Sequence, residues 1–169
     1  MNVGPCEERV FRSINRAPDA LAAPVWAAMQ LGSLPAVYGV GAVLVRTGRP
    51  PTAAATVLVG TAVWGGVKLI KRRVGRGRPD AMLGDVTVRG DPQTGLGYPS
   101  GHAAVVAALA FVVPPADNTV LRAAAVVTAG AVGGARIYVG AHLPLDVAGG
   151  LAIGTICGLA ARALLNTRP

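Results

Sequence analysis

The sequence predicts an all-α integral membrane protein: a helical bundle with about five transmembrane helices and an N-terminal interfacial amphipathic helix. Of its 169 residues, 52% are hydrophobic and only 14% are charged, whereas a soluble domain usually carries about 25% charged residues. The mean hydropathy is +0.50, and long apolar stretches are separated by short basic ones. The length fits a single domain over residues 1–169.

Residues 5–20 are expected to form the amphipathic helix. Val10, Phe11 and Ile14 are spaced three and four residues apart, so they share one helical face, and the charged residues lie mostly elsewhere. A helix of this kind favours a position in the membrane interface. A disordered basic tail is the alternative.

Each of the five apolar segments that follow is predicted to be a membrane helix. The first has no charged residue across 25 positions, enough to cross a hydrocarbon core of about 30 Å. The third is short, because a helix of its length rises only about 20 Å. The segments are residues 21–45, 52–70, 101–113, 120–139 and 144–165.

The fifth segment carries a packing signal. Gly150, Gly154 and Gly158 recur every four residues, which places them on one helical face. Small residues at this spacing allow two membrane helices to approach closely. We therefore expect this face to contact another helix.

Residues 71–98 form the longest polar connection. Glycine and proline recur through it and disfavour regular structure. A loop of this length in a compact domain is usually functional, and we interpret it as an active-site loop; a flexible connector is the alternative.

Three segments carry the residues suited to chemistry: the basic run 71–79, the turn 98–102 and the stretch 135–146. The expected crossings place all three on the same side of the membrane. If they meet, the only two histidines of the chain, a carboxylate and several cations share one pocket. That set suits an anion such as phosphate, with one histidine to attack and the other to donate a proton.

Local spacing supports an anion site. Ser100 and Gly101 lie just before a predicted helix, where free backbone N–H groups favour an anion; a plain helix cap by Ser100 is the alternative. His142 and Asp146 are four residues apart and face one direction. The carboxylate can therefore hold one imidazole nitrogen protonated and leave the other free to attack.

Composition argues against other kinds of site. The eight acidic residues are scattered without metal-ligand spacing, so we expect no metal and no cofactor, with cations taking the role of a metal. The net charge is +8, but aromatic residues are only 4% and most basic residues flank apolar segments. Anionic lipid or phosphate is therefore the expected partner, and nucleic acid is not.

The motifs resemble a known family. Lys71 to Pro79 reads K-x6-R-P, Pro99 to His102 reads P-S-G-H, and Arg136 to Asp146 reads R-x5-H-x3-D. In this order they are similar to the three signature motifs of the PAP2 (type 2 phosphatidic acid phosphatase) superfamily. The third family motif usually opens with serine, but this chain has Ala135 and lacks a hydroxyl that would help to hold phosphate.

The resemblance implies a metal-independent bacterial membrane lipid phosphatase. Its expected substrate is a phosphomonoester or pyrophosphate of a lipid, such as a polyprenyl phosphate, a polyprenyl diphosphate or phosphatidic acid, cleaved through a phosphohistidine. It further implies that His142 is the nucleophile, Asp146 orients it, and His102 is the general acid. The implied phosphate-binding residues are Lys71, Arg78, Ser100, Gly101 and Arg136.

Three other interpretations remain at this point. The cations could simply flank membrane helices. The related vanadium haloperoxidases share the anion pocket, but they are soluble and longer. The chain could also be a non-catalytic membrane protein that binds anionic lipid through a degenerate PAP2 site; the intact His102, His142 and Asp146 favour the enzyme.

The expected location is the bacterial inner membrane, crossed several times. The abundance of Ala, Val, Gly and Arg is typical of a GC-rich bacterial genome and favours a polyprenyl substrate. More Lys and Arg residues lie on the site side than on the far side, which favours a cytoplasmic active site. Family members that recycle polyprenyl diphosphate face outward instead.

Overall fold

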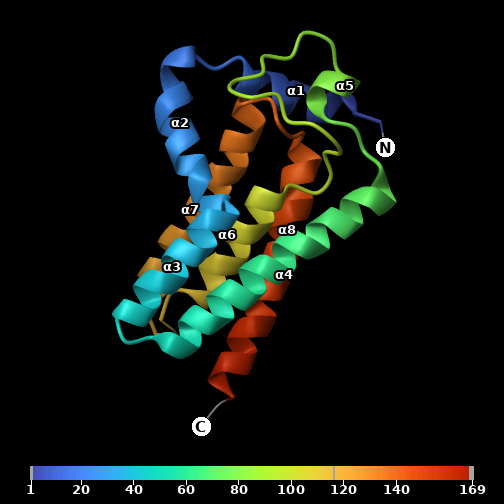
Figure 1. The fold of residues 1–169 in the computed structure, drawn as a ribbon. Coiled ribbons are helices and arrows are strands. Elements are labelled where there is room, and N and C mark those ends of the chain that lie inside the picture. Colours follow the sequence, from blue (N-terminus) through green and yellow to red (C-terminus); the bar gives the residue numbers. More distant parts are fainter. Residues whose placement is uncertain (1, 116, 168–169) are drawn as a thin grey trace.

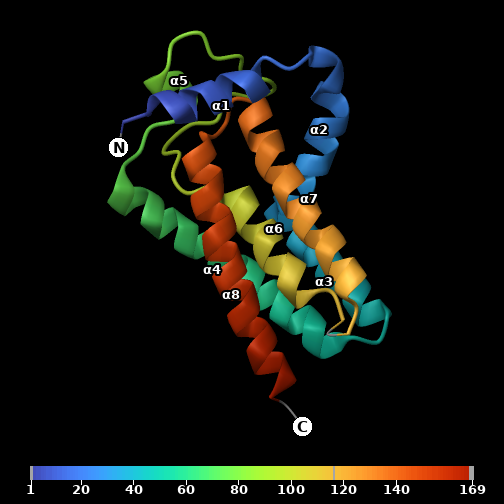
Figure 2. The same ribbon diagram turned by 180° about the vertical axis from the view of Figure 1, so that it is seen from behind.

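A computed structural model describes residues 2–115 and 117–167. The described residues form a helical bundle in which α6 is central, with α3, α4, α7 and α8 around it and α1 lying across one end (Figures 1 and 2). The α-helices are α1 (Pro5–Asn15), α2 (Ala22–Met29), α3 (Leu34–Arg46), α4 (Pro50–Val74), α5 (Pro79–Met82), α6 (Gly101–Val112), α7 (Thr119–Tyr138) and α8 (Pro144–Asn166), and two 3-10 turns are η1 (Asp19–Leu21) and η2 (Gln30–Gly32).

All five predicted membrane segments are helical, but one of them is broken and α6 is too short to cross a membrane, so the described residues hold three candidate spans, or four if the broken pair counts as one. Within the described residues, α4, α7 and α8 lie in helical segments long and apolar enough to cross a membrane. The expected span 21–45 instead bends by 66° between the α2 segment and α3. The break has a local cause: Ser33 caps the new helix by accepting a hydrogen bond from the N–H of Ala36, and Pro35 occupies its first turn, where a missing N–H costs nothing.

Helix α1 is shorter than the predicted 5–20, and its buried face differs from the expected one. Glu7, Phe11 and Asn15 form this face at a spacing of four residues. Phe11 is fully buried in a cluster with Ile137, Leu143 and neighbouring apolar side chains of the bundle. The helix lies across one end of the bundle (Figure 1), and Phe11 on its apolar face packs against protein at the end of α7 and the start of α8, whereas Val10 of the same face stays exposed.

The glycine face of α8 packs against α6, as the sequence predicted. A Cβ atom added to Gly150 would meet the carbonyl oxygen of Ser100, and one added to Gly158 would meet that of Ala108. A Cβ atom on Gly154 would overlap the carbonyl oxygen of Ala104. The two backbones can approach this closely only because the contact face has no side chains.

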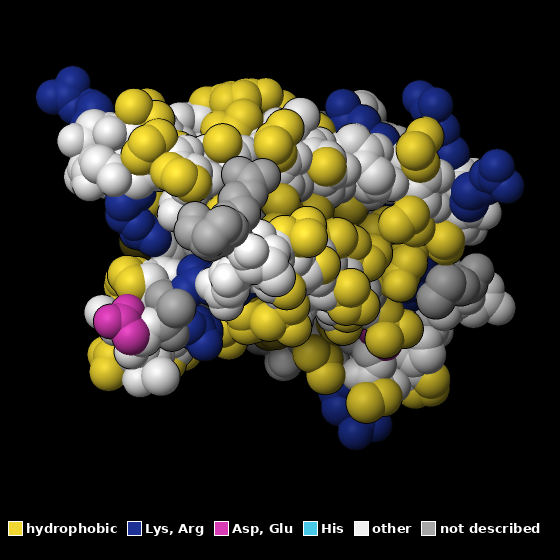
Figure 3. Space-filling view, turned by 90° about the horizontal axis from the view of Figure 1, so that it is seen from below, with side chains coloured by type: hydrophobic (Ala, Val, Ile, Leu, Met, Phe, Trp, Pro, Cys, Tyr) yellow, Lys and Arg dark blue, Asp and Glu magenta, His cyan; other side chains and the backbone are white. Residues whose placement is uncertain are grey.

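The short helix α6 is surrounded by protein, and its far end is supplied with hydrogen-bond donors. Arg49 donates from Nη2 to the carbonyl oxygen of Val113 at 2.8 Å, and Arg162 donates from Nη1 to that of Pro114 at 2.8 Å. The last carbonyl groups of a helix have no partner within the helix, and these two arginines pair the carbonyls that follow α6. Figure 3 looks onto this end of the bundle, where Lys and Arg side chains lie around a largely hydrophobic surface.

The close contact of α6 with α8 generates a first prediction. Gly154→Ala should lower the stability of the purified protein in detergent by about 1–3 kcal/mol, the usual cost of overpacking, because the added methyl group overlaps a backbone carbonyl. Thermal unfolding measures the change. Gly130→Ala is the matched control, since no atom lies within 4 Å of its added Cβ; equal losses for both variants would contradict the packing argument.

Candidate active site

All three predicted segments meet at one cavity of about 220 Å³. It lies where the end of α4, the start of α6, the end of α7 and the loop before α8 come together. Of the predicted residues, Ser100 and Asp146 are fully buried beside this cavity, and the others line it. The lining residues are Trp64, Val67, Lys68, Lys71, Arg78, Gln93, Gly101, His102, Arg136 and His142.

His142 and Asp146 form a buried pair. Asp146 accepts a hydrogen bond at Oδ2 from the N–H of Leu143 (3.0 Å). The same oxygen lies 3.5 Å from Nδ1 of His142, within ion-pair distance, but Nδ1 makes no hydrogen bond in the described residues. Burial and the cations around His142 lower its pKa to about 4, although Asp146 opposes this shift. The imidazole is therefore neutral at pH 7, and Nδ1 is the nitrogen turned toward the carboxylate.

His102 lies in the first turn of α6 and is held from two sides. Its ring makes an edge contact with Trp64 of α4, with a distance of 5.6 Å between ring centroids. On the other side, a Cβ atom on Gly32 would lie 2.6 Å from the carbonyl oxygen of His102. These contacts fix the position of His102 on the cavity wall. Unlike His142, it forms no ion pair with a carboxylate of the described residues.

Four cations line the cavity: Lys68, whose Nζ lies over the ring of Trp64, and the predicted Lys71, Arg78 and Arg136. Backbone carbonyls hold two of the predicted three. Lys71 donates from Nζ to the carbonyl oxygens of Leu96 (2.9 Å) and Gly97 (2.6 Å). Arg78 donates from Nη1 to that of Ala141 at 2.8 Å.

Arg136 completes the set in a different way. It donates from Nη1 to the sulfur of Met29 at 2.8 Å, and its buried Nε has no hydrogen-bond partner in the described chain. Within residues 2–115 and 117–167, no carboxylate forms an ion pair with Lys71, Arg78 or Arg136. The groups that orient these three side chains are uncharged and leave their positive charge in place. The cavity is therefore suited to an anion.

Ser100 does not act as a side-chain cap for α6. It occupies the N-cap position, but its hydroxyl makes no capping hydrogen bond. The Oγ atom is buried and has no hydrogen-bond partner in the described residues. Its backbone N–H donates to the carbonyl oxygen of Asp146 at 2.8 Å, which joins the second and third motif segments directly.

Sequence reasoning missed two residues next to the site. Arg76 was grouped with the cations that flank a membrane helix, yet its side chain is fully buried between Glu7 and Asp146. Glu7 was placed on the polar side of the first helix. A usable signal was present for Glu7, because it lies four residues before Phe11 and eight before Asn15, on the face that is buried.

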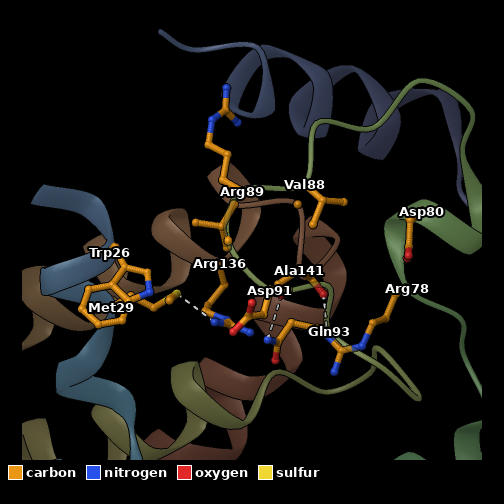
Figure 4. Close-up of a pocket in the computed structure, with 13 residues that line it drawn as sticks. Trp26, Met29, Arg78, Asp80, Val88, Arg89, Asp91, Gln93, Arg136 and Ala141 are labelled. Carbon is orange, nitrogen blue, oxygen red and sulfur yellow. Dashed lines mark hydrogen bonds between the residues drawn. The ribbon is translucent and has the colours of Figure 1, made fainter. Parts of the chain in front are cut away.

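Ala135 packs in an apolar cluster with Met29, Tyr138 and Val139. Next to this cluster lies a second cavity of about 90 Å³, lined by Arg78 and Arg136 together with residues of the loop and α2. Figure 4 shows the Arg136 side chain extending from α7 toward Met29 and the Arg78 side chain beside Ala141. The two arginines therefore border both cavities.

The fold and the site define a helical membrane protein with a cation-lined cavity beside two histidines. The sequence model of the PAP2 superfamily matches residues 51–169, and the chain therefore belongs to the PAP2 superfamily. A search of curated proteins found no significant match.

Two solved structures have similar folds. LpxE from Aquifex aeolicus is 27% identical, with a TM-score of 0.80 over 95% of this chain and 98% of that one. The first transmembrane PAP2 type phosphatidylglycerolphosphate phosphatase from Bacillus subtilis is 21% identical, with a TM-score of 0.80 over 97% of this chain and 86% of that one. Both matches extend beyond the part matched by the family model, since each covers at least 95% of this chain.

Proposed function

We propose that the protein is a metal-independent membrane phosphatase that hydrolyses the phosphomonoester or pyrophosphate group of a lipid through a phosphohistidine intermediate. The observation that carries this proposal is the cavity itself, where a neutral His142 beside Asp146 faces Lys71, Arg78 and Arg136, none of which pairs with a carboxylate of the described residues. Family membership and the two structural neighbours support the same conclusion.

The first step transfers the phosphoryl group to the enzyme. Lys71, Arg78 and Arg136 hold the phosphoryl oxygens, aided by the free hydroxyl of Ser100 and the backbone at Gly101. Nε2 of His142 then attacks phosphorus, and the bond to the lipid oxygen breaks. That oxygen keeps the electron pair and receives a proton from His102.

The second step releases phosphate. A water molecule attacks the phosphorus of the phosphohistidine and gives a proton to His102, and the phosphorus–nitrogen bond breaks. His142 returns to its neutral form with Nδ1 still protonated and turned toward Asp146. Both histidines are thereby restored for the next turnover.

A lipid is the substrate that the surroundings favour. Trp64, Val67 and Lys68 of α4 line the same cavity as the cations, so the phosphate site opens beside a membrane helix. Polyprenyl phosphates, polyprenyl diphosphates and phosphatidic acid fit this arrangement. Phosphate release from a panel of these lipids by the purified protein tests the proposal; no release from any of them would favour a non-catalytic lipid-binding protein.

The roles of the two histidines generate a second prediction. His102→Ala should lower kcat/KM by about 100- to 10,000-fold on a lipid alkyl phosphate, the usual contribution of a general acid. The loss should be much smaller on p-nitrophenyl phosphate, because its leaving group departs as a stable anion. Rates of the variant on the two substrates provide the measurement, and equal losses on both would overturn the assignment of His102.

His142→Ala is the companion variant. It removes the attacking nitrogen, so activity should be lost on both substrates, and acid-labile phosphate should no longer accumulate on the protein. Asp146→Asn should lie between the two histidine variants, because the imidazole remains but its tautomer is no longer fixed. Phosphate label on a variant without His142 would contradict the proposed nucleophile.

Chelation provides a third prediction. In the described part of the chain, no group of three or more His, Cys, Asp or Glu side chains could hold a metal ion, and the cations already stabilise the phosphoryl charge. Activity should therefore remain unchanged in excess EDTA. The control is a parallel assay with added magnesium. Activity that EDTA abolishes and magnesium restores would contradict the proposed metal-independent mechanism.

A further inference from the structure

We propose that Glu7 of α1 is a positioning residue for the His142–Asp146 pair, acting through the buried side chain of Arg76. The inference rests on the proposed function for its kinetic test. Glu7 lies outside residues 51–169, the part that the family model matches, and outside the three motif segments.

The first observation is a buried chain of charged groups. Arg76 donates from Nη2 to Oε2 of Glu7 at 2.6 Å and from Nη1 to Oδ1 of Asp146 at 2.8 Å. Its side chain is fully buried, as is that of Asp146, and Glu7 is only 7% exposed. A guanidinium with a carboxylate on each side has little freedom to rotate.

The second observation is how Asp146 is held. Its Oδ1 atom is bound by Arg76, and its Oδ2 atom is bound by the N–H of Leu143. Oδ2 is also the atom that faces Nδ1 of His142. The orientation that presents Oδ2 to the histidine therefore depends on Arg76 holding the other oxygen in place.

Glu7 in turn holds Arg76 and the start of α8. Its second oxygen, Oε1, accepts a hydrogen bond from the N–H of Leu145 at 3.0 Å, one residue before Asp146. The same carboxylate thus binds both the guanidinium that orients Asp146 and the backbone turn that carries Asp146. Its negative charge also balances Arg76, which leaves the charge of Asp146 available to the imidazole.

Helix α1 presents Glu7 from a fixed position. Phe11 is fully buried one turn later, and Asn15 donates from Nδ2 to the carbonyl oxygens of Thr87 (2.8 Å) and Tyr138 (3.0 Å). The face formed by Glu7, Phe11 and Asn15 thereby attaches α1 to the loop and to the end of α7. This helix is part of the support of the catalytic pair.

The test uses Glu7→Gln, which keeps the shape of the side chain and removes its charge. We expect kcat on a lipid phosphate to fall by about 10- to 100-fold, by analogy with the loss when the partners that orient metal-ligating histidines are removed, with KM changed less than about twofold. Glu8→Gln is the matched control, since within the described residues Glu8 pairs only with Arg12 on the same helix and should keep full activity.

A double-mutant cycle separates positioning from general stabilisation. If Glu7 acts through Asp146, Glu7→Gln should cost almost nothing further in an Asp146→Asn background. The same fold loss in both backgrounds would overturn the proposal. If Glu7→Gln fails to fold, Glu7→Asp is used instead. The aspartate keeps the charge but is too short to reach both Arg76 and the N–H of Leu145. Its effect on kcat should also vanish in the Asp146→Asn background.

A measurement that does not depend on enzyme activity tests the role of Glu7 separately from the proposed phosphatase function. The chain has only two histidines, so nitrogen NMR of protein labelled at histidine gives two ring signals, assigned with a His102→Gln variant. Glu7→Gln should reduce the fraction of His142 protonated at Nδ1, and Glu8→Gln should not. An unchanged tautomer would overturn the role of Glu7, whereas a shifted tautomer in a protein that hydrolyses no lipid phosphate would reject only the proposed function.

Discussion

The close contact between α6 and α8 is the constraint on which the site depends. Because Gly150 and Gly154 have no side chains, the backbone of α8 lies against Ser100 and Ala104 of α6. At this distance the N–H of Ser100 reaches the carbonyl oxygen of Asp146. The contact therefore fixes the spacing between the turn that carries His102 and the turn that carries His142, and a wider helix separation would take the two histidines out of the same cavity.

The cations of the cavity lower the stability of the folded protein. Lys71, Arg78 and Arg136 are held near apolar side chains without carboxylate partners in the described chain, and desolvated charges of one sign destabilise a folded protein. Carbonyl oxygens of the loop reduce this cost for Lys71, since they accept its hydrogen bonds. An anion that enters the cavity supplies the missing charge, so binding gains from interactions already oriented before the anion arrives.

Much of this architecture could be predicted from the sequence, because the membrane imposes simple rules on length and hydropathy. The bounds of α6, α7 and α8 follow the predicted spans closely, and the glycine repeat identified the α8 face that packs on α6. The predicted loop 71–98 was drawn too long, because α4 continues to Val74 and carries Lys71, and α5 forms within the loop. The break before α3 was missed because Ser33 and Pro35, a helix start signal, lie inside a stretch without charges. Arg76 and Glu7 were missed for another reason: burial of a charge depends on a partner distant in sequence, and spacing does not reveal that partner.

The buried chain from Glu7 through Arg76 to Asp146 is hard to explain by stability alone. Burying an ion pair costs desolvation free energy that its attraction often fails to recover, and apolar side chains of similar volume are frequently as stable. What such a chain provides is orientation, because each hydrogen bond is short and each carboxylate also binds a backbone N–H. A leucine or methionine network could fill the same space at the start of α8, but it could not turn one particular oxygen of Asp146 toward Nδ1 of His142. The geometry therefore points to a requirement of the proposed catalytic pair rather than of the fold, and under this proposal the first helix of the chain supports the site.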